Sequence, residues 1–339
     1  KFIKRLKLLL STGDTLDLKR GDIFIKKGSD FNLKLKNREL KIKIPDYSMP
    51  NIKTAAGYYI KDNMDLVDLF IGHEGTLAVI LEADISLGKK PEEVMSFFSF
   101  FPAEDNALDF VKDAKKYQAL SLEYMDSHAL ELLAVKYPNI PKSAKGLIYF
   151  EQDYEKKSEA TVIDSWTKLL EKHNALTEDS YFADSDKERA KLRELRHALP
   201  DSVNDIVKKN KMPKVGTDIA VPEAGFKEMM EFYKEKLLSS KIDYVIFGHI
   251  GENHMHVNML PKTEEEFKKS RMVYMEFVKK AVGMGGTVSA EHGIGKLKHQ
   301  FLEAMYGKDN LKQMAALKKS LDPSCILGLD NIFPKELLK

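Results

Sequence analysis

Residues 248–258 read GHIGENHMHVN, a run that joins the end of one β-like segment to the start of another through two glycines. A second short stretch, residues 289–295, reads SAEHGIG. Together the two stretches contain four of the nine histidines, and the second adds Glu291 beside His292. Imidazole and carboxylate ligands suit transition metals, and an imidazole near a metal can exchange a proton near neutral pH. The sequence therefore predicts a metal site beside a proton-transfer group.

The second β-like segment places several polar side chains on one face. Alternate residues of a strand share a face, so His254, His256 and Asn258 are expected to lie together. His249 lies seven residues before His256 and has the wrong parity for that face. It can join the cluster only if the intervening glycines bend or bulge the chain.

A three-ligand metal site follows from this arrangement. Neutral imidazoles of His249 and His256 with the carboxylate of Glu291 would leave coordination positions open for a substrate, as catalytic sites require. His292, next to Glu291, is then the candidate base. His254 is interpreted equally well as a neighbouring polar residue. The alternatives are a histidine-rich exposed strand and, at residues 289–295, a helix cap followed by a loop.

Two further segments carry candidate functional residues. Residues 72–76, GHEGT, form a glycine turn between apolar runs that we expect to be strands, 66–71 and 76–80, where backbone can approach a cofactor closely. Arg193 and Arg196 are predicted near the end of a charged helix, before Pro200, where most arginines are solvated or paired. No GxGxxG motif or Walker loop supports nicotinamide or ATP binding.

Composition excludes several classes of protein. The 54 basic and 52 acidic residues nearly cancel and are interspersed, so no nucleic-acid partner is expected. Cys325 is the only cysteine, which excludes intrachain disulfides and thiolate metal sites and favours a reducing, cytoplasmic setting. No run approaches the roughly 20 apolar residues of a membrane span, so any membrane association would be peripheral.

The chain divides by pattern into three parts, 1–90, 91–296 and 297–339. The first ten residues are predicted to form a strand before a turn at Gly13-Asp14. They start with lysine rather than methionine, so the chain is expected to be a fragment. The last part is a helical segment over 297–320 that ends at Asp322-Pro323.

The central part alternates between β-type and helical patterns. Helices are expected to begin near Ala103, Ser127, Lys157, Asp186, Glu223 and Thr263. Strands are expected over 94–100, 120–125, 147–151, 215–221, 244–247 and 254–260. This order predicts an α+β fold in which one antiparallel sheet is covered by helices on one face.

Several motifs together resemble a known family. The two histidine stretches, KTAAGY at 53–58, GHEGTL at 72–77, DIAVP at 218–222 and Asp322-Pro323 resemble FAD-linked oxidases of the vanillyl-alcohol oxidase fold. The most similar branch contains D-lactate dehydrogenases, glycolate oxidase flavin subunits and D-2-hydroxyglutarate dehydrogenases. The resemblance covers nearly the whole chain in order.

The resemblance implies a fold and a set of residue roles. Residues 1–90 correspond to the second half of the FAD domain, 91–296 to a cap domain with a ferredoxin-like sheet, and 297–339 to a segment that returns to the FAD domain. A divalent metal, often zinc, is held by His249, His256 and Glu291. His292 is the base, Asn258 contacts substrate and Arg196 binds the substrate carboxylate. Flavin contacts are implied at Gly57, Gly72, His73, Glu74, Gly75, Thr76 and Val79.

The implied reaction is oxidation of a D-2-hydroxy acid such as D-lactate or glycolate. His292 removes the hydroxyl proton while a hydride passes from the substrate carbon to flavin. The implied partners are this small substrate, an electron-acceptor protein or quinone, and a second copy in a homodimer.

The sequence also departs from the family. Nothing corresponds to the first FAD subdomain with its phosphate-binding loops. His73 replaces a usual serine, Ala78 a usual glycine, and residues 328–331, GLDN, a common NPGK. We therefore expect this chain alone to bind FAD poorly and to be an inactive fragment of a flavoenzyme. The alternatives are an ether-lipid (alkyl-dihydroxyacetone-phosphate) synthase, a flavin-independent zinc hydrolase and a non-catalytic remnant.

Overall fold

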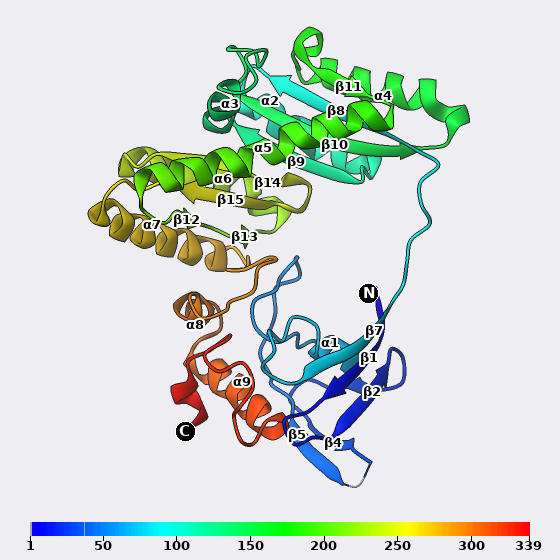
Figure 1. Cartoon of the computed structure of the whole chain (residues 1–339), viewed down its shortest axis with the longest axis vertical. Helices are drawn as coiled ribbons and strands as arrows, with labels where there is room; N and C mark the ends of the chain where they lie inside the picture. Colours follow the sequence, from blue (N-terminus) through cyan, green and yellow to red (C-terminus); the bar gives the residue numbers. More distant parts are fainter. Residues whose placement is uncertain (1, 37) are drawn as a thin grey trace. The chain divides into compact units, whose positions relative to one another are not determined.

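The chain forms two compact units. The computed structural model describes residues 2–36 and 38–339. The first unit combines Lys1–Gly88 with Val278–Lys339, and the second is Lys89–Phe277 (Figure 1). Each unit is therefore described by itself.

The second break in the chain falls inside a helix rather than at residue 296. Helix α7 (Glu264–Gly283) contains the boundary between Phe277 and Val278. The segment after α7 stays with the first unit because its backbone is bonded there. The amide of Ala55 donates to the carbonyl of Ser289 at 2.8 Å.

The first unit is built on a small antiparallel sheet with the order β2-β1-β7. Leu6 and Leu8 alternate with charged residues on β1 and are buried, so one face of the sheet carries the core. The predicted turn at Gly13-Asp14 is confirmed, with Gly13 at φ +86°. The elements of this unit before α7 are β1 (Ile3–Leu9), β2 (Thr15–Lys19), β3 (Phe24–Ile25), β4 (Asp30–Lys34), β5 (Glu39–Lys43), β6 (Met64–Asp65), α1 (Leu66–Leu69) and β7 (Val79–Ile85).

Residues 66–71 were expected to be a strand, and this prediction is wrong. Leu66–Leu69 form the short helix α1, because the Asp65 side chain accepts a hydrogen bond from the amide of Val67 and caps the first turn. The following strand, β7, begins only at Val79. The glycine turn at 72–76 thus connects a helix to a strand.

The C-terminal part of the first unit contains two helices where one was expected. Helix α8 (His299–Tyr306) and helix α9 (Lys308–Leu321) are separated by Gly307 at φ +76°, a conformation that glycine tolerates best. The predicted end of the segment at Asp322-Pro323 is confirmed, since α9 stops at Leu321. A 3₁₀ turn, η6 (Lys335–Leu338), follows.

A buried ion pair fixes the end of α9. Lys318 is 1% exposed, and its ammonium donates to Asp322 Oδ2 at 2.7 Å and to the carbonyls of Thr76 and Leu327 at 2.9 and 2.6 Å. Burial works to raise the pKa of Asp322, but hydrogen bonds from Lys318 and from the Leu327 amide outweigh it and lower that pKa. The pair thereby ties α9 to the glycine turn at 72–76.

The second unit contains one long sheet with the strand order β11-β8-β10-β9-β14-β15-β12, and β13 also pairs with β15. These pairs are antiparallel. Its strands are β8 (Glu93–Phe101), β9 (Ser121–Asp126), β10 (Gly146–Tyr154), β11 (Tyr181–Ala183), β12 (Val215–Gly216), β13 (Ile219–Ala220), β14 (Tyr244–His249) and β15 (His254–Met259). The short helix α3 (Ser127–Ala134) lies between β9 and β10. Apart from it, the chain order β8, α2 (Glu104–Ala114), β9, β10, α4 (Glu159–Lys172), β11 with the spatial order β11-β8-β10-β9 is ferredoxin-like, as expected.

The helices of this unit are α2 (Glu104–Ala114), α3 (Ser127–Ala134), α4 (Glu159–Lys172), α5 (Asp186–Asn210) and α6 (Phe226–Ser240), followed by α7. They lie on both faces of the sheet, not on one. Adjacent residues show this, because Phe97 packs with Phe150 and with Trp166 of α4, whereas Phe98 belongs to the core that includes Leu195 and Leu199 of α5. Side chains alternate between faces of a strand, so the largely apolar strand β8 is buried on both faces from Met95 to Phe101.

Helix α5 passes through a proline. Its 25 residues include Pro200, so Arg193 and Arg196 lie near the middle of the helix rather than near its end. Leu199 and Val203 are fully buried on either side of Pro200, and this packing keeps the helix continuous despite the lost backbone donor.

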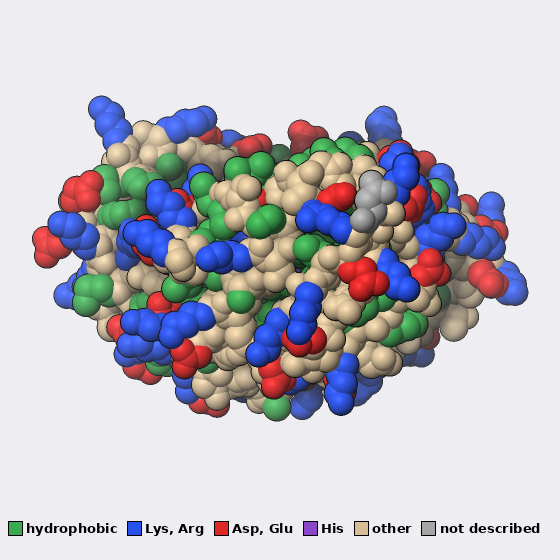
Figure 2. All heavy atoms as spheres, turned by 90° about the horizontal axis from the view of Figure 1, so that it is seen from below, with side chains coloured by type: hydrophobic (Ala, Val, Ile, Leu, Met, Phe, Trp, Pro, Cys, Tyr) green, Lys and Arg blue, Asp and Glu red, His purple; other side chains and the backbone are tan. Residues whose placement is uncertain are grey.

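Surface charge and helix hydropathy agree with the composition. Figure 2 shows basic and acidic side chains interspersed over the face that it draws, in keeping with the near balance of 54 and 52 charges. Among the described residues, no helix combines the length and apolar character that crossing a membrane would need.

The buried pair in α9 provides a first test. We expect Lys318→Met to lower the free energy of unfolding of the first unit by about 3–5 kcal/mol, because Asp322 would stay buried without its cation. Urea unfolding followed by circular dichroism measures the effect. The matched control is Lys168→Met, which breaks an exposed pair with Asp164 that is also four residues apart. We expect the control to change stability by less than about 0.5 kcal/mol; equal effects of the two substitutions would contradict the assignment.

Candidate metal and flavin site

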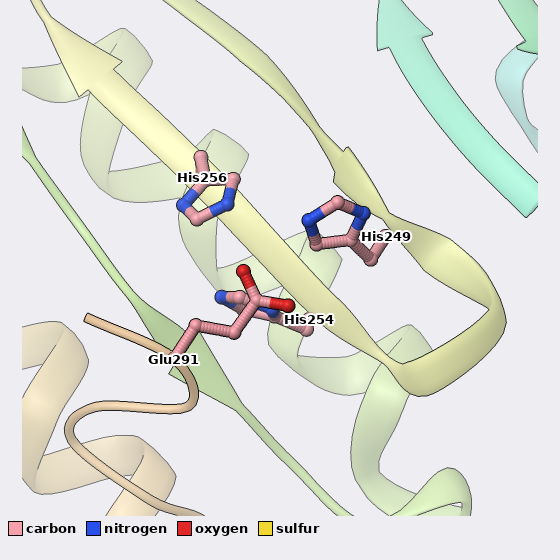
Figure 3. Close-up of side chains that lie close together, drawn as sticks. All are labelled: His249, His254, His256 and Glu291. Atoms are coloured by element: carbon pink, nitrogen blue, oxygen red, sulfur yellow. The ribbon is translucent and has the colours of Figure 1, made fainter. Parts of the chain in front are cut away.

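Three histidines converge on the hairpin formed by β14 and β15. The antiparallel register places Phe247 opposite His256 and His249 opposite His254. Directly opposed residues of two antiparallel strands share a face, so His249 joins the other two without any bulge (Figure 3). The odd spacing between His249 and His256 does not place them on opposite faces, because His249 lies on β14 and His256 on β15. The glycine-containing turn η5 (Ile250–Glu252) reverses the chain between β14 and β15. The glycines therefore bend the chain, as expected for His249 to join the cluster.

Gly248 is needed where the two strands approach each other. Its φ is +151°, and a Cβ there would lie 2.8 Å from the carbonyl oxygen of His254. A larger residue would push β14 away from β15.

His256 is held in one tautomer by the backbone. Its Nδ1 lies 3.0 Å from the carbonyl oxygen of Thr217, which can only accept, so Nδ1 carries the proton. Burial lowers the pKa of His256 to about 4, so the ring is neutral at physiological pH. Nε2 is then the nitrogen through which this ring would bind a metal.

His249 is oriented by a carboxylate. Its Nδ1 lies 2.8 Å from Oε1 of Glu123 on β9, and Arg196 Nη2 donates to the same oxygen at 2.7 Å. A carboxylate that accepts from Nδ1–H directs Nε2 toward a metal. Arg196 is thereby part of this cluster, paired with a residue that the sequence did not single out.

His254 has the surroundings of a metal ligand as well. It is 0% exposed, and its Nε2 lies 2.9 Å from Oδ1 of buried Asp218. Its Nδ1 is buried with no hydrogen-bond partner within the described part of the chain. A buried ring nitrogen of this kind calls for an explanation, and a bound cation supplies one. The sequence signal that could have indicated His254 is the aspartate of the DIAVP segment.

The three rings lie close enough to share one ion. Each offers a ring nitrogen, and these atoms lie within 4.8 Å of one another. Asn258, the predicted substrate contact, lies on the same face of β15, is 3% exposed and donates through Nδ2 to the carbonyl of His256 at 3.4 Å. The rings of His249 and His256 each place Nδ1 beside an acceptor, and His254 has a buried Nδ1 without a partner among the described residues. These nitrogen donors fit a divalent transition metal.

Glu291 and His292 belong to the first unit and are exposed there. They lie between α7 and α8, in a loop held by Ser289, whose hydroxyl donates to the carbonyl of Gly293 at 2.7 Å. Glu291 forms an ion pair with Lys53 of the KTAAGY segment. The loop therefore brings two of the predicted motifs together within one unit.

The glycine turn at 72–76 is tightly bonded within the first unit. His73 Nδ1 accepts from the amide of Leu77 at 3.3 Å, and the Thr76 hydroxyl donates to the carbonyl of His73 at 2.6 Å. The Glu74 carboxylate accepts from the amides of Ile294 and Gly295, both at 2.7 Å. These three side chains thus shape the turn and link it to the loop after Glu291.

The remaining flavin candidates differ in accessibility. Nothing lies within 4 Å of where a Cβ would stand at Gly72 or Gly75, both at positive φ, so this side of their backbone is open. The Gly75 carbonyl instead packs against Gly328, where a Cβ would lie 2.8 Å from its oxygen. Val79 is 46% exposed, on the strand β7 whose residues are all exposed. Gly57 instead packs inward, since a Cβ there would meet Met314 Cε at 3.0 Å. The open backbone of the turn fits a flat cofactor lying against it.

The family described as FAD linked oxidases, C-terminal domain, matches residues 90–329. The chain belongs to this family. The predicted resemblance to FAD-linked oxidases is confirmed.

Individual relatives extend the match beyond this domain. The chain is 28% identical over 299 residues to the glycolate oxidase subunit GlcD of Bacillus subtilis, covering 85% of this chain and 60% of the relative. It is 29% identical over 295 residues to D-lactate dehydrogenase [cytochrome] 1, mitochondrial, of Saccharomyces cerevisiae, covering 83% and 48%. The chain thus spans between 48% and 60% of the length of these two relatives.

Among solved structures, p-cresol methylhydroxylase with substrate bound matches with a TM-score of 0.64 at 13% identity. The match covers 99% of this chain and 66% of that chain. Identity this low shows the fold alone. The match confirms the expected vanillyl-alcohol oxidase fold.

Titration of His73 provides a second test. Burial lowers the pKa of His73 to about 4, whereas an unfolded histidine titrates near 6.5. The unfolded state therefore binds more protons between these values. We expect the stability of the first unit to be complete above about pH 6.5 and to fall by about 3 kcal/mol as pH drops toward 4.

His73→Asn should flatten this pH dependence, because asparagine can accept from the Leu77 amide but does not titrate. Thermal unfolding by calorimetry between pH 7 and 4.5 measures it. Trp166, the only tryptophan, lies in the second unit, so its fluorescence identifies that unit's transition and serves as the internal control. An unchanged pH dependence in His73→Asn would count against the assignment.

Proposed function

We propose that this chain is the substrate- and metal-binding part of a flavoenzyme that oxidises a D-2-hydroxy acid of the D-lactate or glycolate type. The observation that carries the proposal is the histidine cluster on β14 and β15, where His249 and His256 each present Nδ1 to an acceptor. The names of the two relatives supply the substrate class.

The proposed metal ligands are His249, His256 and Glu291. The proposed ion is divalent, and zinc is the proposed metal because nitrogen and oxygen donors suit it. The unpaired Nδ1 of His254 makes this residue a further candidate ligand. When bound, the ion would polarise the substrate oxygens and ease loss of the hydroxyl proton.

The remaining residues have separate roles in the proposal. His292 accepts the hydroxyl proton of the substrate, and Asn258 on β15 contacts the substrate. Arg196 remains the candidate for the substrate carboxylate. Its bond to Glu123 uses one of the five N–H groups of the guanidinium.

Flavin would supply the hydride acceptor. The residues proposed to hold it are Gly57 and the turn of Gly72, His73, Glu74, Gly75 and Thr76, with Val79 beyond it. Because the chain spans about half the length of its relatives, we propose that the phosphate-binding part of the flavin site comes from outside this chain. We further propose a cytoplasmic setting, peripheral membrane contact, and an electron-acceptor protein or quinone as partner.

The test uses the complete protein that carries this chain. We expect it to be yellow and to reduce a dye with D-lactate, glycolate or D-2-hydroxyglutarate. His292→Gln should lower kcat about 10²–10⁴-fold, because the proton acceptor is lost, while bound metal and flavin absorbance are retained. Steady-state dye reduction and metal analysis measure these outcomes.

The matched control is His197→Gln, an exposed histidine on α5 that should leave kcat unchanged. A colourless protein that cannot be reconstituted with FAD would overturn the proposal. Metal-dependent hydrolysis unaffected by flavin would favour a zinc hydrolase instead, and turnover of ether-lipid precursors alone would favour a synthase.

A further inference from the structure

Two side chains from distant elements meet at one carboxylate oxygen. Glu123 Oε1 on β9 lies 2.8 Å from His249 Nδ1 on β14 and 2.7 Å from Arg196 Nη2 on α5. Glu123 is 8% exposed, so the carboxylate is largely withdrawn from water. A buried carboxylate needs a cationic partner, and Arg196 provides it.

We propose that Glu123 is a positioning residue for the metal site and that Arg196 holds it in place. Neither β14 nor β15 can orient the His249 ring by itself, since the acceptor for Nδ1–H comes from β9. With the proton on Nδ1, the lone pair of Nε2 faces the metal position, and the carboxylate makes the ring a stronger donor. This inference rests on the proposed metal site.

Arg196 contributes in two ways. Its guanidinium donates to the same Glu123 oxygen that lies beside His249 Nδ1, which fixes the position of that oxygen. It also lies over the ring of Tyr149 at 6.0 Å, which restricts its position on α5. Arg196 therefore acts on His249 through Glu123, in addition to any contact with substrate.

A second pair in the same unit has the same design without a histidine. Arg193, one helical turn before Arg196, donates to Glu151 Oε1 on β10 at 2.8 Å through Nη2. Glu151 also accepts from the Ser96 hydroxyl at 3.2 Å. The Arg193–Glu151 pair therefore serves as a control, because it joins a helix to a strand in the same way but orients no proposed metal ligand.

The His249 ring and Glu123 also border a cavity of about 500 Å³ within the second unit. Other residues that line it include Lys115, Ser121, Leu122 and Gly251. Of the three clustered histidines, His249 alone is among the lining residues of this cavity in the described part of the chain.

The experiment compares Zn²⁺ affinity by chelator competition in the wild-type chain, Glu123→Gln and Glu151→Gln. We expect Glu123→Gln to bind Zn²⁺ about 10–100-fold more weakly, because a neutral amide can donate to Nδ1 and leave the proton on Nε2. Glu151→Gln should bind as the wild type does. Trp166 fluorescence in urea should give similar midpoints for the two variants, which separates positioning from folding.

Cobalt substitution gives an independent readout. We expect the visible absorption of the Co²⁺ form to change in Glu123→Gln and to stay unchanged in Glu151→Gln. The reason is that Glu123 is hydrogen-bonded to the proposed ligand His249. Arg196→Lys should weaken Zn²⁺ binding less than Arg196→Met, since it keeps the charge.

The outcomes distinguish the two levels of the proposal. A wild-type chain that binds no Zn²⁺ overturns the metal site and the positioning role together. A wild type that binds Zn²⁺ with Glu123→Gln equally tight overturns the positioning role alone. Equal weakening by Glu123→Gln and Glu151→Gln also overturns it, because the effect would then be structural.

Discussion

The antiparallel pairing of β14 with β15 is the constraint on which the candidate site depends. Because His249 stands opposite His254, one pairing register puts three imidazoles on a single face. A shift of one residue would turn His254 and His256 to the opposite face of the sheet. Gly248 permits the close approach of the two strands, so both the hairpin and the histidine cluster depend on this residue.

The site also depends on acceptors supplied by other elements. His256 uses a carbonyl of the segment between β12 and β13, His254 uses Asp218 in that segment, and His249 uses Glu123 on β9. Buried imidazoles need such partners, which select one tautomer for each ring. The first unit follows a similar rule, since Glu74 and Lys318 bind backbone groups and hold the glycine turn to the C-terminal segments.

Much of the fold could be predicted because hydrophobic periodicity is local. The strands at 94–100 and 147–151 and the helix from Asp186 were expected and are present. The errors have local physical causes that periodicity does not report. An aspartate cap turned 66–69 into a helix, and a glycine at positive φ divided the last helical segment. Buried packing around Pro200 kept α5 continuous.

By itself, the sequence determined the residue types, the family and the expectation that histidines of 248–258 form a cluster. Only the tertiary structure decided which acceptor orients each ring. Glu123 lies 126 residues before His249, and no spacing along the chain relates them. Side chains so distant meet only when sheet order places β9 beside β14, and that order is set by packing of the whole unit rather than by either segment.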